Sequence, residues 1–401
     1  MRPIAQTLLY DDAMRLVMDA GHPIDRVERV ALTEADGRVV AAEVTATVDV
    51  PPFDRAAMDG YAVVAADTFG ASAQSPKKVA CVDRVFTGQI PSRGIGAGEC
   101  IEIATGAPMP SGADAVVMVE ETERAGDQVS VMTPVYPQQH VGRRAADIAI
   151  GQPVVKTGQV LNPSRIGAIA ATGSLDINVY ARPSVAILST GNEIAEPGQP
   201  LAPAQIYDIN RFTLETIVRR HGGVSVALPI TGDSVEELSA ALDVALAHDI
   251  IVFSGGSSVG ERDLILDVLH RRGTVHFHGI ALKPGKPTVF GTIEGKPIFG
   301  MPGYPTSCLS NAYMLLVPFL RKVARLPPWR PLTVEAPLTR RVVSTTGRHQ
   351  FYTVRLVDGN AEPAFKASGD ITSMANADGY IEIPAQTDVV EAGTVVTVKL
   401  F

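Results

Sequence analysis

The stretch D-I-I-V-F-S-G-G-S-S-V-G-E-R-D, residues 249–263, decides the fold of this chain. It opens with Ile250 to Phe253, a run of apolar and mostly β-branched residues that is typical of a buried parallel strand. Three glycines follow, and the chain then enters the pattern of an amphipathic helix. A strand that passes through glycines into a helix gathers backbone N–H groups, hydroxyls and a positive helix end. This arrangement favours a bound phosphate or oxyanion.

The segment alone leaves two interpretations open. In the first, the turn binds an anion and Asp263 lies nearby as a metal ligand; the turn residues are Ser254, Gly255, Gly256, Ser257 and Ser258. In the second, it is a flexible strand-to-helix turn whose small residues serve packing. The spacing G-G-x-x-x-G is not the dinucleotide fingerprint, and no G-K-[ST] follows, so Rossmann-cofactor and P-loop interpretations are weak.

Strands and helices alternate strictly on both sides of this stretch. The pattern predicts strands over 184–188, 224–228, 250–253 and 275–277, helices over 210–220 and 234–247, and a final hairpin and helix up to about residue 320. Ser234 and Glu237 form a capping box. This is the signature of a doubly wound α/β domain, which binds its ligands at the carboxyl ends of the strands. The turns at those ends are T-G-N-E (190–193), T-G-D (231–233) and S-G-G (254–256).

Bulk properties narrow the class of protein. The chain has 401 residues, which is too long for one ordinary core and predicts two to four domains. Its net charge of −8 gives no general attraction to nucleic acid or to an anionic membrane, so a bound anion needs a local cluster of cations. The three cysteines are widely spaced and include no C-x-x-C pair, which argues against a disulfide framework and a zinc site. We expect a cytoplasmic protein without a membrane span.

The rest of the chain predicts further domains around the α/β domain. A helix is expected over 7–20, a strand over 43–50, short strands from 78 to 131, and a helix from Pro163 to about Gly173. Prolines near 327–331 mark a linker before a region of strands only. We therefore predict an elongated N-terminal domain (1–50 with 145–180), an inserted β-rich domain (51–144), the α/β domain (181–327) and a C-terminal β domain (328–401).

Two acidic residues have a structural and a functional interpretation. Asp59 lies in the loop P-P-F-D-R-A-A-M-D-G-Y-A-V, which is dense in functional groups, but Asp59-Gly60 is equally the tight turn of a hairpin. Asp208 directly precedes a predicted helix and is either its N-cap or part of an acidic cluster at the strand ends. Acidic residues and amide-rich turns that converge there suit a magnesium–phosphate ligand.

The second informative stretch is Lys283-Pro-Gly-Lys286-Pro287. Proline followed by glycine favours a type II turn, whose ends approach within about 7 Å. This turn would bring two ammonium groups together. Like charges held together repel each other unless water, carboxylates or an anion compensate them. The stretch is therefore either a solvated surface turn or a clamp for an oxyanion or phosphate.

Taken together, the motifs resemble the molybdopterin molybdenumtransferase family, the molybdenum-insertion proteins related to the gephyrin E domain. The match runs in order along nearly the whole chain. Its motifs are the loop over 51–63, A-T-G-A-P-M-P-S-G-A-D-A-V-V (104–117), S-T-G-N-E (189–193), Y-D-I-N (207–210), S-G-G-S-S-V-G-E-R-D (254–263), K-P-G-K-P (283–287) and F-G-M-P-G-Y-P-T-S (299–307).

The resemblance implies a fold, a reaction and partners. The fold is a multidomain α/β protein with a doubly wound α/β domain of the molybdenum-cofactor-binding type, an inserted β-rich domain, an elongated α+β linker domain and a C-terminal β-barrel-like domain. The reaction converts adenylylated molybdopterin and molybdate into molybdenum cofactor and AMP. The implied partners are a second copy of the chain in a homodimer, a molybdopterin adenylyltransferase as upstream donor, and molybdoenzymes or their chaperones downstream.

The resemblance also implies site residues. Asp59, Thr105, Asp147, Glu193, Asp208 and Asp263 match the family's acidic and polar catalytic residues, and Mg²⁺ is held near the pyrophosphate, with Asp263, Asp208 and Glu193 as its ligands. Lys283, Lys286, Pro287, Arg348 and Ser368 match the molybdate pocket. The chemistry is consistent, because cleavage of a phosphoanhydride requires neutralised charge and a dianion requires several fixed donors.

The chain departs from the family pattern at a few positions. Tyr304 stands where the family has asparagine, Ala145 and Ala146 where it has glycine and glutamate, and Thr353 where it has a second arginine. A paralogue that handles tungstate, or a gephyrin-like binding or scaffold protein with weakened catalysis, is therefore an alternative. A nucleotide pyrophosphatase that uses the same phosphate site is another.

Overall fold

The structure is a computed structural model that describes residues 7–232, 234–255 and 264–401. Its internal contacts divide the chain into two compact units. Unit 1 consists of Met1–Glu28 with Tyr180–Phe401, and unit 2 is Arg29–Val179. Unit 2 thus interrupts unit 1 in sequence. The four domain boundaries predicted above stay a prediction, because this division separates two units rather than four.

A six-stranded mixed sheet is the centre of unit 1. The strands, in spatial order, are β16 (Val224–Ala227), β13 (Ser184–Ser189), β17 (Ile250–Ser254), β21 (Lys296–Met301), β20 (Val289–Ile293) and β18 (Thr274–His278). The first four are parallel, and β20 and β18 are antiparallel to their neighbours. β17 is buried along its whole length, as its apolar run predicts. The expected α/β fold class is confirmed.

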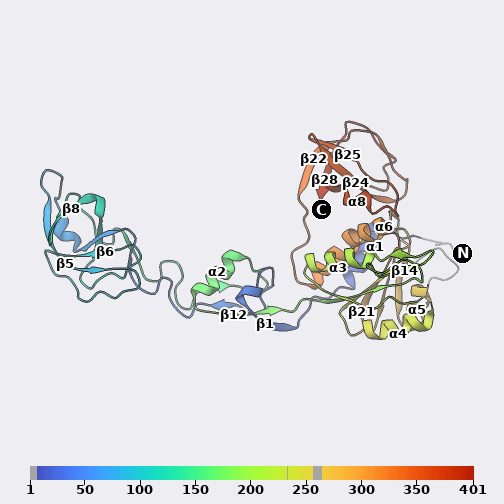
Figure 1. Cartoon of the computed structure of the whole chain (residues 1–401), viewed down its shortest axis with the longest axis horizontal. Coiled ribbons are helices and arrows are strands. Elements are labelled where there is room, and N and C mark those ends of the chain that lie inside the picture. The colour runs from blue at the N-terminus through green and yellow to red at the C-terminus, as the bar shows by residue number, and fades with distance from the viewer. Residues whose placement is uncertain (1–6, 233, 256–263) are drawn as a thin grey trace. The chain divides into compact units, whose positions relative to one another are not determined.

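Helices cover both faces of this sheet (Figure 1). One face packs against α1 (Tyr10–Asp19), α3 (Asn210–Arg220), α6 (Pro305–Asn311), the π-helical turn η4 (Ala312–Leu316) and α7 (Val317–Val323). The other packs against α4 (Val235–Ala245) and α5 (Leu264–Arg272). Ser234 caps α4 as predicted, because its hydroxyl accepts the N–H of Glu237 at 3.1 Å. Among the described residues, no helix is both long enough and apolar enough to cross a membrane.

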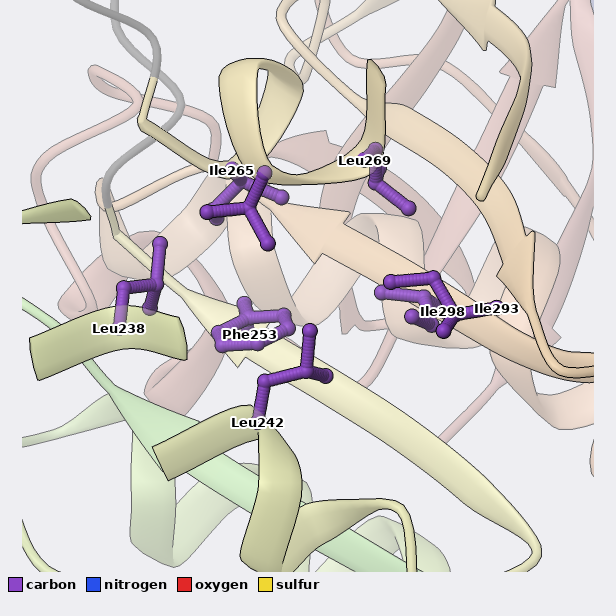
Figure 2. A pocket seen from close by; sticks show the side chains of 8 residues that line it. Leu238, Leu242, Phe253, Ile265, Leu269, Ile293 and Ile298 are labelled. Carbon is purple, nitrogen blue, oxygen red and sulfur yellow. The ribbon is translucent and has the colours of Figure 1, made fainter. Parts of the chain in front are cut away.

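Phe253 is the apolar anchor on the α4–α5 face. Figure 2 shows its ring between Leu238 and Leu242 of α4 and Ile265 and Leu269 of α5. The side chain is 2% exposed, and this apolar layer leaves no space for a water molecule. β17 is therefore fixed rigidly at the position where its carboxyl end enters the candidate site.

Unit 1 also contains a C-terminal β-rich part. Its sheet consists of β19 (Leu282–Lys283), β24 (His349–Val357), β26 (Gly379–Ile383), β28 (Val395–Leu400) and β22 (Thr333–Pro337), with β25 (Asn360–Pro363) on β24. The pair β23 (Val342–Val343) and β27 (Val389–Val390) and the short helix α8 (Thr372–Ala375) complete it. Leu282 pairs with His349 and Lys283 with Gln350 in parallel register. The α/β part therefore supplies a strand to the C-terminal sheet.

The described residues of unit 2 form three apolar clusters. Two belong to a six-stranded sheet in the order β7 (Ala115–Met118), β4 (Gly60–Val63), β6 (Glu99–Ile103), β5 (Lys77–Val85), β9 (Gln128–Val131) and β8 (Thr122–Ala125). The third includes residues of α2 (Pro163–Ala171), β2 (Val44–Thr45), β11 (Pro153–Val155) and β12 (Asp176–Tyr180). β12 pairs with β1 (Val27–Ala31), and β3 (Arg55–Ala56) pairs with β10 (Val141–Gly142). The short one-turn helices are η1 (Leu32–Glu34), η2 (Ala65–Thr68) and η3 (Val119–Glu121).

One local expectation was wrong. The strand expected over residues 43–50 is only β2, because its neighbours pair through isolated contacts rather than a continuous ladder. Of the two interpretations left open for Asp59, the hairpin turn does not form, since β4 pairs with β6 and β7 and not with β3. Gly60 is required there by close packing: a Cβ atom would lie 1.9 Å from the carbonyl oxygen of Val117.

Asp249 connects the segment before β17 to two distant parts of unit 1. Its carboxylate accepts two hydrogen bonds from the Arg26 guanidinium, at 2.7 and 2.8 Å, and two from the Ser184 backbone N–H and hydroxyl, at 2.7 and 2.9 Å. Burial acts to raise the pKa of Asp249, but these bonds outweigh it and lower the pKa. The charged form is therefore the stabilising one.

We expect Asp249→Asn to lower the free energy of unfolding by about 2 kcal/mol at neutral pH, because it weakens bonds to a charged acceptor. Since the folded pKa is depressed, this contribution is complete above the unfolded pKa of about 4 and disappears as pH falls through the lower folded value. Denaturant titrations of wild type and variant should therefore converge in acid. Asp12→Asn, which breaks an exposed pair with Arg15, is the control and should cost less than about 1 kcal/mol. If the difference in unfolding free energy between wild type and Asp249→Asn stayed constant across pH, the stabilising role of the charged Asp249 would be contradicted.

Candidate functional site

Buried polar side chains gather at the carboxyl ends of β13 and β17. Ser189, Thr190 and Ser254 are 3%, 3% and 4% exposed, and the Thr190 N–H donates to the Ser254 carbonyl at 3.0 Å. The hydroxyl oxygens of Ser189 and Thr190 have no hydrogen-bond partner among the described residues. A buried hydroxyl without a partner costs free energy, so this edge of the sheet is chemically incomplete by itself.

Asp208 and Asn210 extend this group from the start of α3. One carboxylate oxygen of Asp208 accepts the N–H of Arg211 at 3.0 Å, which is an N-capping interaction. The other oxygen, Oδ2, is buried and has no partner in the described part of the chain. Asn210 donates to the carbonyl of Gly303 at 2.8 Å, and its own Oδ1 is similarly unpaired. Both alternatives for Asp208 are therefore compatible with the structure: it caps α3 and also presents a free acceptor.

Gly255 and Glu193 border the same edge. A Cβ atom at Gly255 would meet the carbonyl oxygen of Thr190 at 2.5 Å, and φ at this glycine is +91°, so no larger residue fits. The carboxylate of the exposed Glu193 folds against Gly191. Predicted site residues Gly256, Ser257, Ser258 and Asp263 lie outside the described residues, and their assignment stays a prediction.

The unpaired oxygen of Asp208 fits a hard cation such as Mg²⁺, which prefers carboxylate oxygen ligands and keeps several waters or substrate phosphate oxygens. Within residues 7–232, 234–255 and 264–401, no three His, Cys, Asp or Glu side chains come together as a metal site. Among the described residues, Asp208 is thus one candidate Mg²⁺ ligand, and a complete set of protein ligands is not present. Few protein ligands are usual for Mg²⁺ at phosphate sites.

The lysine loop, residues 283–287, forms the second part of the site. The predicted turn at Pro284-Gly285 is wrong: the turn lies at Lys286-Pro287, and Lys283 ends β19 instead. The cause is the pairing of Lys283 with Gln350, which holds that lysine in extended backbone. Because Arg348 immediately precedes β24, the same register brings Arg348 close to the lysine loop.

The three cations of this region have no carboxylate partner among the described residues. The Lys283 ammonium donates to the Thr345 hydroxyl at 2.8 Å. No ion pair links Lys283, Lys286 or Arg348 to an acidic side chain in the described part of the chain. In a protein of net charge −8, neighbouring cations without counter-ions create a local positive potential. This is the electrostatic requirement of an oxyanion pocket.

The two ends of α6 contact two parts of the predicted molybdate pocket. At its start, the Thr306 N–H donates to the Ser368 carbonyl at 3.1 Å. At its end, the Asn311 amide donates to the Gly285 carbonyl at 3.1 Å. Tyr304, just before α6, is 65% exposed. The structure therefore links Ser368 and the lysine loop through one helix.

In unit 2, the structure brings Asp59 and Thr105 together. The Asp59 carboxylate accepts the Thr105 backbone N–H at 2.6 Å and its hydroxyl at 2.9 Å. These two bonds lower the pKa of Asp59, the backbone bond most. The Thr105 carbonyl accepts the Thr87 hydroxyl at 2.8 Å. Asp147 is exposed, and the structure shows no bond between it and this pair.

Sequence reasoning missed three contributors. Thr190 and Asn210 supply unpaired buried oxygens, and Thr345 holds the Lys283 ammonium. Asn210 lies inside the Y-D-I-N motif, so its proximity to Asp208 was a usable signal. Thr345 had none, because only strand pairing between distant segments brings it near Lys283.

The fold and these groups define a class: a multidomain α/β protein whose unpaired cations and strand-end polar groups suit anionic ligands. Comparisons with known proteins identify the family. Three family models match: the MoeA N-terminal region (domain I and II) over residues 8–173, a probable molybdopterin binding domain over 186–322, and the MoeA C-terminal region (domain IV) over 335–401.

Individual relatives agree. Molybdopterin molybdenumtransferase 2 of Mycobacterium tuberculosis is 37% identical over 91% of this chain and 93% of its own length. Molybdopterin molybdenumtransferase of Nostoc sp. is 32% identical over 91% and 87%. The crystal structure of a molybdopterin biosynthesis MoeA protein from Pyrococcus horikosii has a TM-score of 0.85 at 39% identity and covers 98% of this chain and 99% of that one. The chain belongs to the MoeA family of molybdopterin molybdenumtransferases, which confirms the predicted family and enzyme class.

We expect Thr105→Val to raise the pKa of Asp59 part of the way towards its ordinary value, because the hydroxyl donor is lost and the backbone N–H remains. A carboxyl NMR titration measures this shift. Asp83, whose pKa is lowered mainly by the Ser92 hydroxyl, is the internal control and should titrate unchanged. An unshifted Asp59 would show that the hydroxyl bond is absent in solution.

Proposed function

We propose that the chain inserts molybdate into adenylylated molybdopterin in a Mg²⁺-dependent reaction that releases AMP, as a step of molybdenum cofactor biosynthesis. Membership of the MoeA family supports the molybdopterin substrate and the transferase class. The observation that carries the proposal is the set of three cations without carboxylate partners at the lysine loop and the start of β24.

The cations support recognition of a tetrahedral dianion. Lys283 and Lys286 supply charge-assisted donors from one short loop, and Arg348 supplies a planar fork from the position just before β24. Ser368, linked to the loop through α6, offers a hydroxyl. Donors held by strand pairing and by contacts with a buried helix are preorganised, so little reorganisation is needed when the anion binds. In this proposal they hold molybdate, with Pro287 shaping the turn between them.

The strand-end group supports binding of the phosphoanhydride. The hydroxyls of Ser254 and Thr190 would donate to phosphate oxygens, and Gly255, Gly256, Ser257 and Ser258 are assigned to the same role from the motifs. Asp208, with Glu193 and Asp263 assigned from the motifs, would hold Mg²⁺, which when bound neutralises charge on the phosphoanhydride. Asp59, Thr105 and Asp147 of unit 2 are assigned to catalysis by the family motifs alone.

The proposal includes partners and a location. The enzyme would act as a homodimer, receive its substrate from a molybdopterin adenylyltransferase, and deliver the cofactor to molybdoenzymes or their chaperones. We propose a cytoplasmic location, in keeping with the net charge and the reduced cysteines. A tungstate-handling paralogue and a scaffold with weakened catalysis are the competing functions, and both are distinguished by the assays below.

For the oxyanion half of the site, we expect the double variant Lys283→Ala with Lys286→Ala to raise the KM for molybdate by roughly 100-fold or more, because each charge-assisted bond contributes about 1.5–3 kcal/mol. Molybdate-dependent AMP release from adenylylated molybdopterin measures it. Lys78→Ala, at an exposed lysine of β5, is the control. Faster turnover with tungstate would favour the tungstate-handling paralogue. Absence of any AMP release would favour the scaffold, and AMP release without either oxyanion would favour a pyrophosphatase.

For the phosphate half, we expect Asp208→Asn to reduce kcat by roughly 100-fold while the Mg²⁺ concentration needed for half-activity rises, because the variant presents a neutral ligand in place of the carboxylate. Its remaining cap to Arg211 should keep α3 folded, which circular dichroism checks. Chelation of Mg²⁺ should abolish activity of the wild type. If Asp208→Asn leaves the Mg²⁺ dependence unchanged, Asp208 is only a helix cap.

A further inference from the structure

Two cysteines that are far apart in sequence lie side by side in unit 2. β5 and β6 are parallel neighbours, and their register pairs Cys81 with Cys100 directly. The register shifts just after this pair, so Val82 bulges and the two cysteines remain opposite each other. Neighbouring strands lie about 4.8 Å apart. This is within the Cα separation of about 4.4–6.8 Å that a disulfide requires.

Both side chains point to the same face of the sheet. Cys100 is a fully buried member of the apolar core that includes Val79 and Val129, and Cys81 packs against that core from a half-buried position. Both thiols are free in the structure, and the Cys81 thiol donates a weak hydrogen bond to the Asp83 carbonyl at 3.5 Å. A bond between them would therefore need only side-chain rotation.

The two thiols differ in reactivity. Cys81 is half-buried and lies near the Arg124 guanidinium, whose pKa is raised first by the charge of Cys81. Because Cys81 is the more exposed of the two cysteines, an oxidant from solvent reaches its sulfur first. Arg124 is held in place by Glu102 and by the Gly126 carbonyl at 2.8 Å. Burial raises the pKa of Cys100 to about 12, so this residue remains a thiol.

We propose that Cys81 and Cys100 form a peroxide-sensitive dithiol that closes to an intramolecular disulfide. The Cys81 thiolate attacks one oxygen of hydrogen peroxide, the O–O bond breaks, and the products are Cys81 sulfenic acid and hydroxide, which takes up a proton. The Cys100 sulfur then attacks the Cys81 sulfur, the S–O bond breaks, and the Cys100 proton leaves with the hydroxyl as water. Two thiols and one peroxide thus give one disulfide and two waters.

The position of the pair couples this chemistry to a predicted site. β6 ends at Ile103, two residues before Thr105, and β5 ends at Val85, two residues before Thr87. Thr87 donates to the Thr105 carbonyl at 2.8 Å, and Thr105 donates to Asp59. A covalent link between β5 and β6 fixes the base of the segment that holds Thr105. The proposal itself does not depend on the proposed enzymatic function.

The test uses the full chain, treated with hydrogen peroxide under native conditions and analysed by thiol labelling and by mass spectrometry of peptides. We expect two of the three thiols to become unreactive together, with loss of two hydrogens and a linked peptide pair from 81 and 100. Cys308→Ser, at a buried cysteine elsewhere, should behave as the wild type. Cys100→Ser should instead accumulate a sulfenic acid at Cys81 that dimedone traps, and Cys81→Ser should leave Cys100 reduced.

A further variant tests the role of the guanidinium. Arg124→Gln should slow the first step by roughly 3- to 10-fold, because it removes the positive charge near the sulfur that attacks the peroxide. Circular dichroism verifies that each variant is folded. Independent oxidation of the cysteines, a disulfide between two chains, or a pair that reacts only in denaturant would each overturn the proposal.

Discussion

The candidate oxyanion site depends on the register of one short extended segment, residues 280–283. The Leu8 N–H donates to Gly279 at 3.2 Å, the Ala281 N–H donates to Leu8 at 2.7 Å, and the His349 N–H donates to Ala281 at 2.9 Å. The segment is thus held between the beginning of the chain and β24. A shift of one residue in a strand moves every side chain to the opposite face. These backbone bonds therefore determine which way Lys283 points relative to Arg348.

Side chains beside this ladder reinforce the register without neutralising the lysines. Tyr10 stacks on His349 with ring centroids 4.7 Å apart, and its hydroxyl donates to the Met314 carbonyl at 3.1 Å. Glu382, the acidic group of this part of the sheet, is already bonded to His349 at 3.2 Å and to Lys399. Because the Glu382 carboxylate is already paired with these two side chains, it does not neutralise the cations of the lysine loop. The scaffold thus tolerates neighbouring like charges that solvent or a ligand must screen.

Sequence reasoning succeeded where the interactions are local and failed where they join distant parts of the chain. The helix over 210–220 and the Ser234 cap were correct because periodicity and capping are local. The strand over 43–50 was wrong, and the hairpin alternative at Asp59-Gly60 does not form, because the strands there pair with segments far along the chain. The turn at Pro284-Gly285 failed for the same reason: pairing with β24 outweighs the local turn preference. The Cys81–Cys100 pair likewise exists only through strand register, which no spacing rule contains.

The two halves of the candidate site in unit 1 carry opposite kinds of unsatisfied groups. Within the described part of the chain, the strand ends present oxygens without partners, above all Asp208 Oδ2 and Asn210 Oδ1, whereas the lysine loop presents cations without counter-ions. Each unpaired buried polar group costs about 1–3 kcal/mol, so a fold that needed only stability would pair or replace them. Acceptors of this kind attract a metal cation, and cations attract an oxyanion. In the proposed reaction, a metal-bound phosphoanhydride would satisfy the acceptors and a dianion would screen the cations, so both kinds of group are consistent with the proposed pair of substrates.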